Sequence, residues 1–192
     1  MRTLIRPALV LLALFTLLTG VIYPVLVTGL ARVFFPHQAG GSLLRDANGG
    51  VVGSALLGQQ FSDPRYFWGR PSATGPAPYN AAASAASNQG PLHPALHAAV
   101  TQRIAELRAA NPEVQGAVPA DLATASGSGL DPHISPEAAR FQAARIAAAR
   151  GWSTAEVLAR VEAQVLPRTL GVLGEPRINV LLLNQDLDAQ QR

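Results

Sequence analysis

The chain of 192 residues, 48% of them hydrophobic, is long enough for one ordinary domain or for a membrane anchor followed by a domain of about 150 residues. Its lack of cysteine excludes disulfides, thiolate metal sites and an acylated lipoprotein anchor, and its lack of lysine excludes a P-loop and Schiff-base catalysis. The net charge of +3 comes from three arginines in the first 35 residues, because the other twelve are balanced by twelve acidic residues, so no nucleic-acid surface is expected.

The first predicted element is a membrane-spanning helix over Pro7 to Ala31, a stretch without a charged side chain. At about 1.5 Å per residue this helix would be about 37 Å long, enough to cross a hydrocarbon core of about 30 Å. A cleaved signal peptide is the alternative, but its apolar region is usually only about 7–15 residues long. We therefore predict a transmembrane anchor over residues 1–35 and an extracytoplasmic domain over residues 36–192.

The orientation of this helix follows from the charges that flank it. Arg2 and Arg6 precede the helix, whereas Arg32 follows it. Because positive charge favours the cytoplasmic side, we expect a single-pass protein of the inner membrane with a cytoplasmic N-terminus and a periplasmic domain.

Two features suggest that the helix is more than a tether. Ala13, Thr16 and Gly20 are small residues at helical spacing, a pattern that allows another helix to approach closely. Pro24 cannot donate a backbone hydrogen bond to the carbonyl of Gly20, so the helix should be distorted near Tyr23. We predict a specific contact with another membrane helix.

The region that follows is predicted to begin with β structure. Asn48-Gly49-Gly50 separates two short apolar runs, which is typical of a hairpin. A group of aromatic residues comes next and is interpreted as a core or loop anchor rather than a ligand-stacking site; it consists of Phe61, Tyr66, Phe67 and Trp68. Residues 70–91 are rich in Pro, Ala, Ser and Gly and lack periodicity, so we expect a long ordered loop that serves a binding surface.

Three helices and a strand are predicted after this loop. The first helix covers Pro94 to Ala110, with Leu96, Val100, Ile104 and Leu107 on one face. The second starts after Ser135 and ends at Gly151, and the third starts at the Ser153–Glu156 capping box and ends before Pro167. Residues 177–184 are predicted to form a buried strand followed by a polar tail. Strands at both ends of a helical middle predict an α+β domain.

The densest polar segment runs from Ser126 to Pro136 and contains Ser128, Asp131 and His133. These are the residue types of a hydrolase triad, but a triad is defined by geometry and the segment lacks the G-x-S-x-G motif. A turn that leads into the Ser135 cap is the simpler interpretation. His93 and His97, at i and i+4, are interpreted as surface residues because no carboxylate accompanies them as in metal-binding helices. We therefore predict no catalytic, cofactor-binding or metal-ligating residue.

Several motifs are similar to those of one family, and together they extend over nearly the whole chain. They are GSALLGQQF (53–61), YFWGRPSA (66–73), Tyr79-Asn80, Ser87-Asn88, DLATASGSGLDPHISPEAA (121–139), Arg150-Gly151 and GEPRINVLLLN (174–184), together with the N-terminal helix that contains Tyr23-Pro24. On these residues the sequence resembles the KdpC family, whose members are subunits of the bacterial ATP-driven potassium transporter.

The resemblance implies a non-catalytic accessory subunit with one membrane helix that supports assembly and activity of the complex. The implied partners are a P-type ATPase subunit that hydrolyses ATP and a channel-like subunit that binds potassium, so ATP and potassium would be handled by the complex. A further role proposed for the family is to raise the ATP affinity of the ATPase subunit. We expect any such effect to be indirect, since the domain should lie outside and the chain lacks a P-loop. The alternatives are a membrane-anchored periplasmic hydrolase that uses Ser128, His133 and Asp131, and a free-standing ligand-binding sensor.

Overall fold

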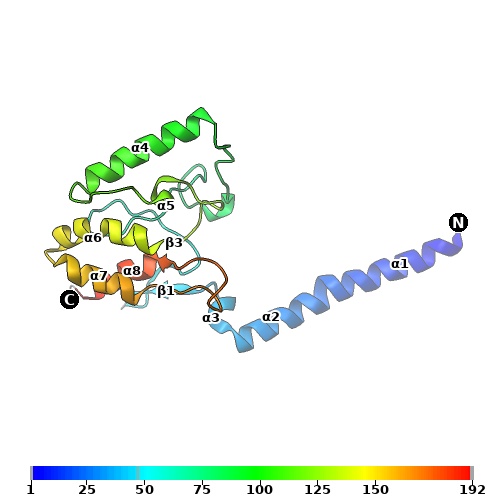
Figure 1. Cartoon of the computed structure of the whole chain (residues 1–192). Helices are drawn as coiled ribbons and strands as arrows, with labels where there is room; N and C mark the ends of the chain where they lie inside the picture. Colours follow the sequence, from blue (N-terminus) through cyan, green and yellow to red (C-terminus); the bar gives the residue numbers. More distant parts are fainter. Residues whose placement is uncertain (1, 47, 191–192) are drawn as a thin grey trace. The chain divides into compact units, whose positions relative to one another are not determined.

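A computed structural model describes residues 2–46 and 48–190, which form two compact units divided between Val52 and Gly53 (Figure 1). The first unit is mainly a long helix, made of α1 (Arg2–Leu17), η1 (Leu18–Ile22) and α2 (Tyr23–Phe34), followed by the short α3 (Pro36–Ala39). The most apolar 18-residue window of Thr3–Phe34 has a mean hydropathy of 2.4, and the stretch is long and apolar enough to cross a membrane. The predicted helix over Pro7 to Ala31 is therefore present.

The long helix changes its geometry at the position predicted from Pro24. Residues Leu18–Ile22 form a π-helical turn, and the N–H of Tyr23 donates to the carbonyl of Leu18. Proline has no N–H to donate and its ring crowds the preceding turn, so a wider turn just before Pro24 relieves the conflict. The irregularity is thus present as a π-helical turn at the start of α2.

The predicted hairpin is present as β1 (Leu43–Arg45) and β2 (Val51–Ser54), which pair in a two-stranded sheet. The turn is held by Asp46, whose carboxylate accepts 2.8 Å hydrogen bonds from the N–H groups of Asn48 and Gly50. An aspartate in this role mimics a backbone turn and fixes the hairpin locally.

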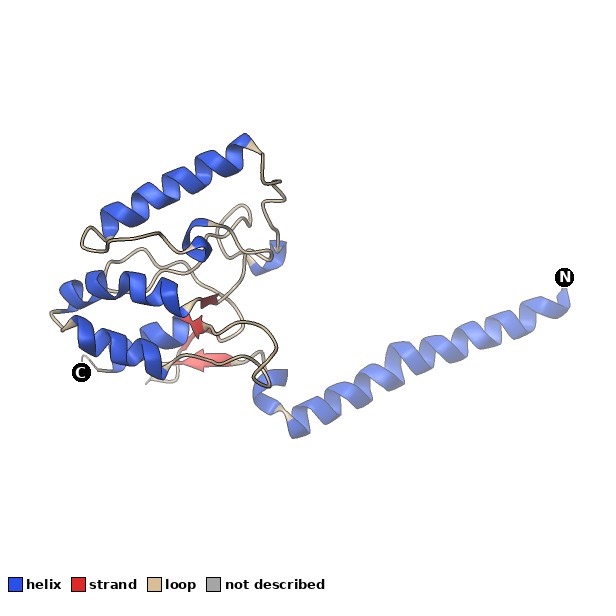
Figure 2. Cartoon of the chain, in the orientation of Figure 1, coloured by secondary structure: helices blue, strands red, loops and turns tan. Residues whose placement is uncertain are grey.

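The second unit contains five helices and a small antiparallel sheet (Figure 2). The helices are α4 (Pro94–Ala110), α5 (Ala120–Ala123), α6 (Pro136–Arg150), α7 (Thr154–Ala163) and α8 (Val180–Ala189), with a 3-10 turn, η2 (Ala81–Ala83), in the long loop. The sheet pairs β3 (His133–Ile134) with β4 (Ile178–Asn179), so that Ile134 lies opposite Ile178. Helices with a small sheet confirm the α+β prediction for this unit.

The two central helices begin and end where their capping residues predict. The Ser135 hydroxyl accepts a 3.0 Å bond from the N–H of Ala138 at the start of α6, and Gly151 ends that helix with a left-handed φ of 69°. Ser153 and Glu156 form a reciprocal capping box at the start of α7.

The core lies around α6, α7 and α8, which pack side by side (Figure 1). Its fully buried large side chains come from both ends of the unit and include Phe67, Ile134, Ile146, Val157, Val161, Ile178, Leu183 and Leu187. Helix α4 is more peripheral: Leu107 is buried, whereas the other three residues of its predicted apolar face are half-buried. The core therefore depends on α6 to α8 and on the segment around Phe67.

The predicted strand over residues 177–184, with its polar tail, is wrong. Ile178 and Asn179 do pair with β3, but the Asn179 side chain then accepts a 3.1 Å bond from the N–H of Leu182 and caps α8. A continuous apolar run does not distinguish a buried strand from a buried helix. Because Asn179 is a favourable N-cap, a helix begins after it; this helix continues to Ala189 and includes the aspartates that were expected in the tail.

Candidate functional site

Residues 70–91, which are expected to serve a binding surface, are hydrogen-bonded to the densest polar segment, residues 126–136. The N–H of Ser126 donates to the carbonyl of Pro71 (3.2 Å), and the N–H of Ala85 donates to the carbonyl of Ser128 (3.1 Å). The hydroxyl of Ser72 donates to the carbonyl of Gly129 (2.7 Å). We call residues 70–91 and 126–136 together the composite loop, because neither segment is a free loop.

Side-chain hydroxyls organise the first segment from within. The Ser72 hydroxyl accepts a 2.9 Å bond from the N–H of Tyr79, and the Thr74 hydroxyl accepts a 3.0 Å bond from the N–H of Asn80. The Thr74 hydroxyl also donates to the carbonyl of Ala77 (2.8 Å). Local hydrogen bonds of this kind replace regular secondary structure, which explains how a loop of this length is ordered, as predicted.

Tyr79 is packed against glycine backbone at the base of the composite loop. A Cβ atom added at Gly58 would collide with Cε1 of Tyr79 and lie 2.6 Å from the carbonyl oxygen of Asp131, so only glycine fits there. The Tyr79 hydroxyl donates to the carbonyl of Arg70 (2.5 Å), and burial raises the pKa of Tyr79 to about 12. Tyr79 thereby fixes the backbone next to the charged group described below.

Arg70, Asp131 and His133 form a partly buried charged cluster. The Asp131 carboxylate accepts bonds from Nη1 of Arg70 (3.1 Å) and from the N–H of His133 (3.0 Å), and Nδ1 of His133 lies 3.5 Å from it. Burial acts to raise the pKa of Asp131, but the bonds from His133 and Arg70 outweigh burial and hold the pKa below its usual value. Nε of Arg70 is buried and has no hydrogen-bond partner in the described part of the chain.

This cluster borders an open cleft of about 680 Å³. Its charged lining residues are Arg70, Asp121, Asp131, His133, Glu137, Glu175 and Arg177. Several of these charges are already engaged: the Asp121 carboxylate accepts a 2.7 Å bond from the N–H of Ser135, and Glu175 pairs with Arg168. The cleft also has apolar lining residues, among them Pro119, Ile134 and Pro176, so it is an open surface of mixed character rather than an enclosed charged pocket.

The structure does not assemble the triad of the hydrolase alternative. Asp131 and His133 are adjacent, but the Ser128 hydroxyl accepts a 3.1 Å bond from the N–H of Leu130, and within residues 2–46 and 48–190 no hydrogen bond joins it to His133. A serine nucleophile needs its base within hydrogen-bond reach. These three residues therefore stabilise the turn before the Ser135 cap instead of forming a nucleophile–base pair.

Of the two histidines at the start of α4, His93 has a structural role as the N-cap. Nδ1 of His93 accepts a 3.2 Å bond from the N–H of Ala95 and caps the helix, while His97 is exposed. In the described residues, no group of three His, Asp or Glu side chains is arranged to hold a metal ion. That the chain has no metal site remains a prediction.

The aromatic segment is held by paired amide side chains that the sequence does not reveal. Asn184 accepts from the N–H of Phe67 (2.8 Å) and donates to its carbonyl (3.0 Å). Gln142 accepts from the N–H of Trp68 (2.8 Å) and donates to its carbonyl (3.1 Å). Each amide replaces the hydrogen bonds of a neighbouring strand, so residues 67 and 68 are bound to α8 and α6 as if in a sheet.

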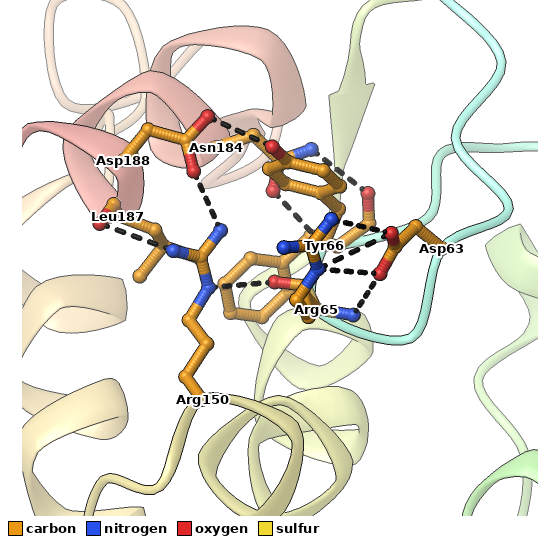
Figure 3. A network of polar contacts seen from close by, with 8 residues as sticks. Asp63, Arg65, Tyr66, Arg150, Asn184, Leu187 and Asp188 are labelled. Carbon is orange, nitrogen blue, oxygen red and sulfur yellow. Dashed lines mark hydrogen bonds and ion pairs between the residues drawn. The ribbon is translucent and has the colours of Figure 1, made fainter. Parts of the chain in front are cut away.

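Two buried arginines, Arg150 and Arg145, complete this attachment, and Figure 3 shows the contacts of Arg150. Arg150 donates to the carbonyls of Arg65 (2.8 Å) and Leu187 (3.2 Å) and to the carboxylate of Asp188 (2.8 Å), which also accepts from the Tyr66 hydroxyl (3.0 Å).

The second of these arginines, Arg145, lies over the ring of Trp68 at 4.1 Å, and burial lowers its pKa to about 10. Phe67, between Tyr66 and Trp68, is completely buried. The interpretation of the aromatic segment as a core anchor is confirmed.

Comparison with known proteins identifies the family. The family described as K+-transporting ATPase, c chain (KdpC), matches residues 5–189. The chain belongs to the KdpC family. The potassium-transporting ATPase KdpC subunit of Herpetosiphon aurantiacus is 61% identical over 188 residues, which cover 98% of this chain and 97% of that protein. The KdpC subunit of Methylibium petroleiphilum is 58% identical over 192 residues, the full length of both chains.

The matched range extends from the first turn of the N-terminal helix to Ala189, the last residue of α8. The resemblance deduced from the sequence motifs is thereby confirmed. Both relatives are named as the KdpC subunit of a potassium-transporting ATPase.

Proposed function

We propose that the chain is a non-catalytic accessory subunit of an ATP-driven, high-affinity potassium import complex and that it supports assembly and activity of that complex. The observation that carries the proposal is the KdpC match over residues 5–189, with relatives of 57–61% identity along nearly their whole length. The geometry agrees with a role without chemistry, because Ser128 and His133 do not form a nucleophile–base pair.

The N-terminal helix is proposed to anchor the protein in the inner membrane, with the N-terminus in the cytoplasm and the second unit in the periplasm. The most apolar window of Thr3–Phe34 is 0% buried within the described chain. An apolar helix left uncovered by its own protein needs lipid or another membrane helix around it. The small residues Ala13, Thr16 and Gly20 are the proposed contact with a helix of the complex.

The proposed partners are an ATP-hydrolysing P-type ATPase subunit and a channel-like subunit that binds potassium. The composite loop is the proposed contact surface in the second unit, since it is ordered by its own hydrogen bonds and contributes Arg70, Asp131 and His133 to an open cleft. ATP and potassium would be bound by these partners, and the chain itself would need no cofactor. An effect on the ATP affinity of the ATPase subunit would then be indirect, transmitted through the helix or the outer surface.

Co-purification in mild detergent tests the proposal. The tagged chain should bring down a large ATPase and a channel-like subunit together, with potassium-dependent ATP hydrolysis in the purified complex. Gly20→Leu should reduce their recovery, because nothing lies within 4 Å of the position where the new side chain would start and the added bulk would meet only the partner helix. Gly29→Leu is the matched control, since Gly29 is equally open and lies about two and a half turns further along.

Recovery of the chain alone would refute the complex, and equal recovery of both glycine variants would refute the contact at Gly20. The hydrolase alternative is tested by Ser128→Ala. Loss of a hydrolytic activity of the isolated chain would favour an enzyme, whereas an intact complex with unchanged ATP hydrolysis favours the accessory role.

A further inference from the structure

A hairpin in the second unit projects between α7 and β4. Residues 166–177 fold back on themselves: Leu166 and Arg177 exchange two backbone hydrogen bonds (2.8 and 3.0 Å), and Thr169 and Leu173 exchange two more (2.9 Å each). We call this element the 166–177 hairpin, and residues 169–174 its tip.

The tip is apolar and exposed. Leu170 is 86% exposed, Val172 73% and Leu173 58%, and the tip sequence TLGVLG has no charged residue. Single exposed apolar residues are ordinary, but three large ones on a turn of six residues form a patch. Large contiguous apolar patches on a protein surface mark sites of contact with lipid or with another protein.

The backbone conformation of Leu170 also indicates that this patch is a contact site. Its φ of 55° lies in the left-handed region, where glycine and asparagine are favoured and a leucine side chain is unfavourable. Because the Leu170 side chain is exposed and its backbone conformation is unfavourable for leucine, the residue adds little to the stability of the folded chain. Its side chain is therefore explained by something outside the chain.

We infer that the tip of the 166–177 hairpin enters the interfacial region of the lipid bilayer, an inference that rests on the membrane anchoring in the proposed function. Two properties of the tip suit lipid. Arg168 and Glu175, the charges nearest the tip, pair with each other at 2.5 Å, so no unpaired charge accompanies the apolar residues. The N–H groups of Thr169, Gly171, Val172 and Leu173 are all bonded within the hairpin, as a backbone in a water-poor environment requires.

The anchor also keeps the second unit close to the membrane. The connection from residue 36 to residue 52 would span at most about 60 Å even if fully extended. Because this connection limits how far the second unit can move away, an exposed apolar tip on that unit meets the bilayer at a high effective concentration, and a weak apolar contact is sufficient for binding.

Site-specific labelling of the full chain in lipid vesicles tests the inference, and the absence of native cysteine makes each label unique. A fluorophore is attached to Val172→Cys at the tip, to Leu92→Cys as a matched control and to Leu17→Cys in the helix. Leu92 is 91% exposed and lies outside the hairpin. Quenching by lipid-bound nitroxides should be several-fold stronger at residue 172 than at residue 92, and quenching by aqueous iodide should be correspondingly weaker.

A second substitution separates contact from folding. Asparagine tolerates the left-handed conformation, so Leu170→Asn should leave the hairpin folded but reduce nitroxide quenching at residue 172 to the level of residue 92. If the label at 172 is as accessible to iodide as that at 92 while residue 17 is quenched by lipid, the inference is wrong and the anchoring holds. An unquenched label at residue 17 would instead refute the anchoring. Protection of residue 172 only when partner subunits are present, without lipid quenching, would assign the tip to a protein pocket and overturn the inference.

Discussion

The charged cluster of the composite loop permits a quantitative prediction for Asp131→Ala. The substitution removes an acceptor of bonds from Arg70 (3.1 Å) and from the N–H of His133 (3.0 Å). A hydrogen bond to a charged group contributes about 1.5–3 kcal/mol, and partial exposure favours the lower value for each. We expect the free energy of unfolding to fall by about 3 kcal/mol, because Arg70 would also keep a partly buried charge without its partner.

Asp186→Ala is the matched control. Arg160 donates to Asp186 at 3.0 Å, and the two side chains are 28% and 30% exposed, close to the 26% and 27% of Arg70 and Asp131. The Asp186 side chain is held by this ion pair rather than by a second bond from a backbone N–H in the described chain, so its loss should cost about 1 kcal/mol or less. For a unit of this size the two variants should lower Tm by roughly 10 °C and roughly 3 °C.

The assay is unfolding of the full chain in detergent, followed by the fluorescence of Trp68 and Trp152, which both lie in the second unit. The pH dependence adds an independent test. Because the pKa of Asp131 is lowered in the folded state, its contribution is present above the pKa of an unfolded aspartate and is lost as the pH falls through the lower folded value. The difference between wild type and Asp131→Asn should therefore shrink below about pH 4. Equal costs for Asp131→Ala and Asp186→Ala would refute the reasoning.

Three further predictions concern single positions in the second unit. The pKa of Tyr79 is raised to about 12 from an ordinary 10, so wild type should lose stability between these values because the unfolded state ionises first. Tyr79→Phe should lose less stability over the same range, because only the raised pKa of Tyr66 still contributes; urea unfolding at pH 8 and pH 11 measures the difference. Gly58→Ala should cost about 2 kcal/mol or more by collision with Tyr79, while Gly90→Ala, with nothing within 4 Å, should change Tm little. Leu170→Asn should leave Tm unchanged or raise it by a few degrees, because asparagine suits the left-handed backbone; a clear loss of stability would show that Leu170 packs within the fold.

Local signals in the sequence predicted the parts of the fold that depend on neighbouring residues. Ser135, Gly151 and Ser153 act within one turn of their own helices, so α6 and α7 begin and end as predicted. The strand predicted over residues 177–184 was wrong because a continuous apolar run is equally typical of a buried strand and of a buried helix. The side chain of Asn179, which caps α8, determines that the chain is helical from Val180 onward.

In the candidate site, too, local features were predicted from the sequence and contacts between distant residues were not. Its two segments were both singled out from composition, but their union depends on contacts such as that between Ser72 and Gly129, which are far apart in the sequence. The roles of the buried polar residues Gln142 and Asn184 were not predicted from the sequence, because only the position of the aromatic segment gives their side chains backbone partners. Composition predicts that a chain segment is a loop, but not which loop it meets.

The attachment of the aromatic segment to α8 determines when the second unit can be completed during synthesis. Phe67 is bonded to Asn184, Tyr66 to Asp188 and the carbonyl of Ala55 to Asn179, each across more than a hundred residues. Contacts so distant in sequence cannot form while the chain is still emerging, in contrast to domains that fold from the N-terminus onward. The last helix made is the one that closes the core. A chain truncated before residue 184 should therefore remain unfolded, and the second unit should stay an open polypeptide until its final helix is made and then fold in one late step.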